Sequence, residues 1–165
     1  MDSKAKILGH GMHPILIVFP LGLLATAAVF DIVYLIKDAA QPWTTVSYWM
    51  IAAGIVGGLL AASTGWIDWF AIPSGTRAKS IGLVHGAGNA VVMLLFALSW
   101  WLRHNTPNNA PDTTALALSF LAVVLALGTG WLGGELVERL GVSVHDGAHL
   151  DAPRSLSGRA ATERK

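Results

Sequence analysis

The 165-residue sequence contains no cysteine, and charged residues make up only 13% of it. The absence of cysteine excludes disulfides, iron–sulfur ligation and thiolate catalysis by this chain. Soluble domains carry roughly 25% charged residues, so about half of the usual charge is missing. The hydrophobic content is 53% and the mean hydropathy is +0.55. This composition indicates a protein that lies in a lipid bilayer.

Four long apolar segments account for the missing charge. Each is close to the ~20 residues that a helix rising ~1.5 Å per residue needs to cross a bilayer core. The first is too long for the apolar region of a signal peptide, so we expect it to remain as a membrane helix. The predicted spans are residues 14–37, 48–71, 80–103 and 113–138. The sequence predicts an all-α, four-helix transmembrane bundle over residues 1–141 and a flexible polar tail over 142–165.

Positive charge is distributed unevenly about these spans. With four spans, the N-terminus, the middle loop and the C-terminus share one side of the membrane. Nine Lys and Arg residues lie on that side, and only Lys37 and Arg103 lie on the other. Cytoplasmic loops carry such an excess, so we expect both termini in the cytoplasm and the protein in the inner (plasma) membrane. Most of the tryptophans fall near the predicted span ends, as in an aromatic belt.

A motif recurs at the ends of the second and fourth spans. The second ends in STGWIDW and the fourth in GTGWLGGEL, so Thr-Gly-Trp is followed by Asp68 in one and by Glu135 in the other. The first and third spans each begin with a histidine, His13 and His85. The chain therefore resembles two tandem helical hairpins, which we expect to be related by a pseudo-two-fold axis along the membrane normal.

Small residues at helical spacing form a second pattern on the same two spans. They are Gly54, Gly58, Ala61 and Gly65 on the second span, and Ala122, Ala126, Gly130 and Gly134 on the fourth. Such faces let membrane helices approach closely. A flat cofactor between helices needs the same space, so the pattern alone leaves both interpretations open.

Two prolines shape the predicted first span, which begins HPILIVFPLGLL. Pro14 fits the first turn of a helix, where its missing N–H is harmless, and this placement puts His13 at the cap. Pro20 has no N–H for the carbonyl near Leu16, so it predicts a kink. The kink gives the His13 end a shape that a straight helix would not have.

Four segments together resemble a known family: HPILIVFPLGLLATAAVFD, TGWIDW, GLVHGAGN and GWLGGELVERLGVSV. In combination they are similar to the predicted membrane-protein family called domain of unknown function 2231. The resemblance covers nearly the whole chain except the tail, and it implies a membrane protein without a settled activity. Rieske-type domains fused to some relatives imply a link with electron transfer.

A b-type haem protein is the first functional hypothesis. Haem iron takes axial nitrogens from side chains on facing helices, and the two hairpins supply one histidine each, His13 and His85. Asn89, one turn from His85, or Asp68 could orient a ligand ring, and Arg77 could pair with a haem propionate. The hypothesis predicts electron transfer or a redox accessory role.

Two other hypotheses stay open. The first is a metal or proton site built of His13, Asp68, His85 and Glu135, a set that suits zinc, iron or manganese. The second is a non-catalytic accessory subunit, whose polar groups lie in the wet interfacial layer. No motif for hydrolysis points to an enzyme, and nothing suggests nucleic acid as a partner. The bilayer, other membrane redox subunits or a second copy of the chain are the expected partners.

Overall fold

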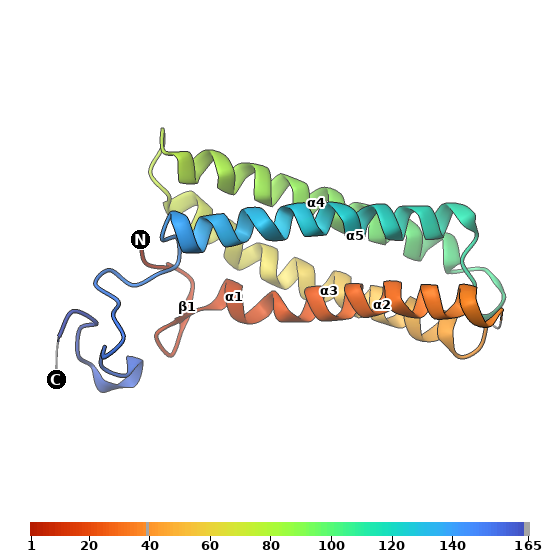
Figure 1. Ribbon diagram of the computed structural model, residues 1–165, viewed down its shortest axis with the longest axis horizontal. Coiled ribbons are helices and arrows are strands. Elements are labelled where there is room, and N and C mark those ends of the chain that lie inside the picture. The colour runs from red at the N-terminus through yellow and green to blue at the C-terminus, as the bar shows by residue number, and fades with distance from the viewer. Residues whose placement is uncertain (39, 164–165) are drawn as a thin grey trace.

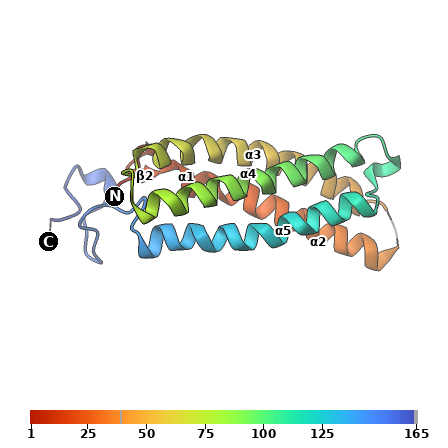
Figure 2. The same cartoon turned by 90° about the horizontal axis from the view of Figure 1, so that it is seen from above.

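A computed structural model describes residues 1–38 and 40–163 of the chain. Within these residues, four long apolar helical stretches run side by side in alternating directions and form one bundle (Figures 1 and 2). The predicted all-α, four-helix transmembrane fold is confirmed. Arg164 and Lys165, which belong to the charge bias above, lie outside the described residues.

Each half of the chain forms a helical hairpin. The first hairpin consists of α1 (Met12–Leu16), α2 (Val18–Lys37) and α3 (Trp43–Ala71). The second consists of α4 (Arg77–Arg103), the 3-10 turn η1 (Pro107–Asn109), α5 (Thr113–Gly134) and the π-helical turn η2 (Glu135–Arg139). Helix α3 begins five residues before the predicted span, because residues expected in a loop continue the helix.

The helices bury many small and polar side chains and expose many large apolar ones. The buried face of α3 carries Thr44, Ser47, Gly54 and Thr64 among others, whereas Leu127 on α5 is 72% exposed. A soluble protein would bury its large apolar residues instead. In a bilayer the surrounding lipid is itself apolar, and small residues let helices pack closely. The chain is therefore a multi-pass membrane protein with four spans.

The first span is interrupted three residues before Pro20. Because Pro20 has no N–H, the carbonyl of Leu16 lacks its usual helical donor. Helix α1 accordingly ends at Leu16, and α2 begins at Val18. The interruption lies where the sequence predicts a kink.

The start of the first span differs from the expectation. Helix α1 begins at Met12 with Gly11 as its N-cap residue. The expectation that His13 occupies the cap is therefore wrong, because the helix begins two residues earlier than expected. Within the first turn, the imidazole is free to reach the neighbouring helix α3.

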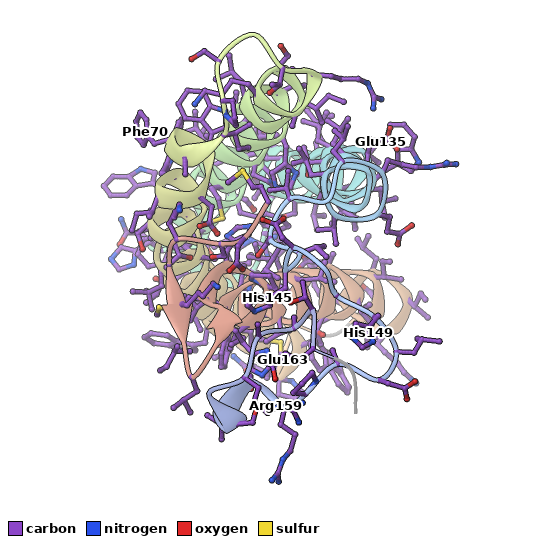
Figure 3. All side chains as sticks on the ribbon, turned by 90° about the vertical axis from the view of Figure 1, so that its left-hand side faces the viewer. Phe70, Glu135, His145, His149, Arg159 and Glu163 are labelled. Atoms are coloured by element: carbon purple, nitrogen blue, oxygen red, sulfur yellow. The ribbon has the colours of Figure 1, made fainter. Side chains whose placement is uncertain are left out.

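The N-terminal segment folds back over one end of the bundle. Its strands β1 (Lys6–Ile7) and β2 (His10–Gly11) pair in antiparallel fashion. The tail lies at the same end and includes the turn η3 (Ser155–Ser157). Figure 3 looks onto this end and shows His145 beside the strands, where its Nε2 lies 3.1 Å from the carbonyl oxygen of Gly9. The tail thus contacts the N-terminal segment, and its flexibility stays a prediction.

An apolar core fills the middle of the bundle. Its buried members are Leu24, Ala27, Ile51, Val92, Phe96 and Ala122. Along each hairpin these residues fall between a histidine near one end and an ionisable residue near the other. The core therefore separates two polar regions, one at each end of the bundle.

Candidate functional site

His13 and His85, called here the histidine pair, face each other between the two hairpins. Their ring centroids are 6.5 Å apart, and the ring planes meet at 84°. His13 lies on α1 and His85 lies on α4, more than seventy residues apart in the sequence. The fold thus brings together one imidazole from each half of the chain.

Each imidazole of the pair is anchored to the other helix of its own hairpin. The Nδ1 of His13 lies 2.8 Å from the carbonyl oxygen of Ala61, and the Nδ1 of His85 lies 2.8 Å from that of Thr129. A carbonyl oxygen can only accept a hydrogen bond, so each Nδ1 carries the proton. In the neutral ring, Nε2 then keeps its lone pair, as a metal-ligating histidine requires.

A glycine makes room for each ring, one helical turn beyond the carbonyl that anchors it. A Cβ atom added to Gly65 would lie 2.9 Å from Nδ1 of His13, and one added to Gly133 would lie 3.1 Å from Cε1 of His85. Any side chain at these positions would push the ring away from the helix. The same arrangement, a carbonyl and a glycine four residues later, therefore holds both imidazoles.

The surroundings of the two rings differ. The side-chain nitrogen of Asn89 lies 3.2 Å from Nε2 of His85 and donates to the carbonyl of His85 at 2.9 Å. Thr129 in turn donates to the side-chain oxygen of Asn89 at 3.0 Å. The residue one turn beyond His13 is the apolar Ile17. Asn89 thus contacts the ring that the sequence predicts it to orient.

Asp68, the acid of the first Thr-Gly-Trp motif, binds the N-terminal segment. Its buried carboxylate accepts hydrogen bonds from the hydroxyl of Ser3 at 2.8 Å and from the backbone N–H groups of Lys4 at 2.7 Å and Ala5 at 3.2 Å. These bonds fasten the N-terminal segment to α3. The sequence did not predict this contact, because the N-terminal segment has no helical periodicity that would indicate where it packs.

Glu135 and Arg77 bind each other. The guanidinium Nη2 of Arg77 lies 2.6 Å from the carboxylate of Glu135, and this ion pair joins the starts of α4 and η2 (Figure 3 shows Glu135). Within residues 1–38 and 40–163, no three His, Asp or Glu side chains gather as a set that could hold a metal ion. The structure thus brings together the two imidazoles of the suggested four-residue metal set and places its two acids with other partners.

A second polar cluster lies at the opposite end of the bundle, and the sequence did not predict it. Arg103 and Asp31 form a bidentate ion pair, with both N···O distances 2.7 Å and both side chains fully buried. Three serines, Ser47, Ser99 and Ser119, hydrogen-bond the ion pair or each other. These five residues, called here the ion-pair cluster, come from all four long helices.

The equal spacing of two charged residues from the two histidines is the one feature of the sequence that indicates the ion-pair cluster. Asp31 lies eighteen residues after His13, and Arg103 lies eighteen residues after His85. Two residues of opposite charge thus hold the same place in the two halves. In the sequence, Arg103 has the position of a charged residue at the end of an apolar segment, where a loop is expected to begin. One sequence does not show which helix packs against this position.

The fold and the polar contacts define an integral membrane protein with four helical spans and a polar cluster at each end. The model of the family described as predicted membrane protein (DUF2231) matches residues 9–146. The chain belongs to this family, as the sequence motifs suggested. Searches of the curated proteins and of the solved structures found no match.

Proposed function

We propose that this protein binds haem b between its two hairpins, with His13 and His85 as the axial ligands, and that it transfers electrons. One observation carries the proposal: the two rings face each other at 6.5 Å with both Nδ1 atoms anchored. Imidazoles bound on opposite sides of one iron, with metal–nitrogen bonds of about 2 Å, have ring centres about 6.3 Å apart. The observed separation fits that arrangement.

The donor set favours haem over a bare metal ion. A haem iron takes one or two ligands from the protein, whereas a zinc ion in a structural site takes four. The histidine pair offers two, while Asp68 and Glu135 are engaged with Ser3 and Arg77. Ligation by both His13 and His85 would leave the iron no open position for oxygen, and such a haem would supply electron transfer.

The packing between hairpins also favours a cofactor at this place. The hairpins contact each other mainly through α3 and α4, and much less through α2 and α5. Gly65 and Gly133 keep both rings close to their own hairpins, and the ring centroids lie 6.5 Å apart where the hairpins meet. The side chain of Arg77, which binds Glu135 through one nitrogen, is 59% exposed at the same end, so its other N–H groups can pair with a propionate.

The absorption spectrum of the purified protein, oxidised and reduced with dithionite, tests the proposal. We expect a b-type spectrum in the wild-type protein after expression with sufficient haem, at one haem per chain. The spectrum should be lost in His85→Ala and His13→Ala. It should persist in His149→Ala, which removes an imidazole from the tail. A colourless wild-type protein, or a spectrum unchanged by both ligand substitutions, would refute the proposal.

We also propose that both termini face the cytoplasm. Arg103, one of the two cations on the opposite side, is buried in an ion pair with Asp31, which leaves Lys37 as the cation in that loop region and strengthens the charge bias. Because the chain has no cysteine, single substitutions can report the orientation. A membrane-impermeant maleimide added to intact cells should label Asn108→Cys and spare Ser155→Cys. The reverse labelling would overturn the orientation.

A further inference from the structure

The outer surface of α5 has a hollow of about 340 Å³ near the end where the termini lie. It is lined by Trp131, Gly134, Glu135, Glu138 and Arg139. Trp131, Glu135 and Glu138 are spaced four and three residues apart, so they share one face of the helix. Gly134 lies between them and contributes no side chain, and a Cβ atom added there would meet nothing within 4 Å. The missing side chain is thus what makes the surface hollow.

The hollow lies at the level of lipid headgroups. Trp131 is 69% exposed, and exposed tryptophans near span ends lie at the membrane–water boundary. One turn deeper, Leu127 is exposed on the apolar surface of the same helix. A molecule in the hollow would therefore have its polar part beside Glu138 and Arg139 and its apolar part along α5, which is the arrangement of a phospholipid.

The charges around the hollow distinguish among phospholipids. Glu135 is paired with Arg77 across to α4. Within the described residues, the carboxylate of Glu138 and the guanidinium of Arg139 have no hydrogen-bond or ion-pair partner. These neighbouring groups belong to η2, whose backbone includes a bond from the N–H of Leu140 to the carbonyl of Glu135 at 3.2 Å. One free anion and one free cation complement a headgroup that carries both charges.

We propose that this hollow binds a zwitterionic phospholipid whose headgroup ends in a primary ammonium, that is, phosphatidylethanolamine. The ammonium donates hydrogen bonds to the carboxylate of Glu138, and the phosphate accepts them from the guanidinium of Arg139. A choline headgroup has no N–H to donate, and a glycerol headgroup has no cation for Glu138. The site therefore selects phosphatidylethanolamine over phosphatidylcholine and phosphatidylglycerol, independently of any haem.

Lipid retention measured by native mass spectrometry tests this site. The full chain is incorporated into nanodiscs that contain equal parts of phosphatidylethanolamine, phosphatidylcholine and phosphatidylglycerol, and the lipids that stay bound after release are identified. A charge-assisted hydrogen bond to Glu138 should favour phosphatidylethanolamine by about ten-fold over phosphatidylcholine. Equal retention of the three lipids, or preferential retention of phosphatidylglycerol, would overturn the proposal.

Substitutions locate the bound lipid. Gly134→Leu fills the hollow, and Glu138→Gln removes the anion, so both should abolish the preference. Gly130→Leu is the matched control, because a Cβ atom at Gly130 also meets nothing within 4 Å and Gly130 does not line the hollow. A preference that survives Gly134→Leu would overturn the assignment. So would a wild-type dimer that Gly134→Leu converts to a monomer, because the hollow would then hold a second copy of the chain.

Discussion

The ion-pair cluster and the histidine pair lie at opposite ends of the bundle and use their hydrogen bonds differently. In the ion-pair cluster, Arg103 contacts Asp31 through both terminal nitrogens and also reaches three serines. In the histidine pair, each ring is anchored through Nδ1 to a backbone carbonyl, and Nε2 of His85 also contacts Asn89. Within the described residues, Nε2 of His13 has no hydrogen-bond partner. The ion pair of the first cluster is thus hydrogen-bonded on all sides by protein groups, whereas the histidine pair has one ring nitrogen, Nε2 of His13, without a partner.

This difference suits a structural role for the ion-pair cluster and the proposed ligand-binding role for the histidine pair. Buried polar groups with all partners in place join helices in a membrane, where lipid supplies no hydrophobic drive for association. The ion-pair cluster links all four long helices, and its charges cancel, so it stabilises the contact between hairpins. Polar groups with unused lone pairs inside a membrane point to a ligand instead. We therefore place the proposed haem site at the end of the bundle that holds the histidine pair.

The largest expected effect comes from breaking the ion pair. Arg103→Leu or Asp31→Leu alone leaves a buried charge without its partner, and such a loss costs about 3–5 kcal/mol of folding free energy. Unfolding of the purified protein in mixed micelles by increasing sodium dodecyl sulfate measures this cost. The double variant Asp31→Leu/Arg103→Leu should recover most of the stability, because no unpaired charge remains. A double variant as unstable as the sum of the single ones would show that the charges act separately.

Removing a ring from the histidine pair should cost the fold much less. His85→Ala loses one hydrogen bond to the carbonyl of Thr129, worth about 0.5–1.5 kcal/mol, in the haem-free protein. The same unfolding measurement compares it directly with Arg103→Leu. Equal losses at the two ends would remove the distinction drawn between them, and His85 would then be a structural residue like Arg103.

Smaller changes at the two glycines should perturb ligand binding more than stability. Gly65→Ala places a methyl group 2.9 Å from Nδ1 of His13 and Gly133→Ala places one 3.1 Å from Cε1 of His85, so the haem content of the purified protein should fall in both. The shorter contact predicts the larger fall for Gly65→Ala. Gly130→Ala, whose methyl group meets nothing within 4 Å, should retain the wild-type haem content.

The smallest effect concerns pH and the N-terminal segment. Burial acts to raise the pKa of Asp2, but the hydrogen bond from Lys6 and the charges of His145 and Lys6 outweigh it, so the pKa lies below its usual value of 3.8. A lowered pKa means that these contacts stabilise the segment above pH 3.8 and are lost as the pH falls through the lower, folded-state pKa. The protection of residues 2–11 against hydrogen exchange, relative to the intrinsic exchange rate at each pH, should therefore fall under strongly acidic conditions. In Asp2→Asn this pH-dependent loss of protection should be absent, and an unchanged loss would assign it to another group.

The sequence predicts the helices better than their mutual contacts. Long apolar segments and the charges between them are local features, so the four spans follow directly from them. The pairing of Asp31 with Arg103 depends on how two helices are rotated about their axes, which one sequence does not specify. Asp68 shows the same limit, because its partners come from an N-terminal segment without periodicity. His13 and His85 could be proposed together because both lie at the same end of their hairpins.

The electron paramagnetic resonance spectrum of the oxidised, haem-loaded protein tests the proposed ligation by His13 and His85, because it reports both the number of imidazole ligands and the angle between their planes. The rings of His13 and His85 meet at 84°, and nearly perpendicular axial imidazoles give a highly anisotropic low-spin ferric signal. We expect this signal in the wild-type protein and its loss in His13→Ala and His85→Ala. A high-spin ferric signal, or a wild-type protein that takes up no haem, would contradict it.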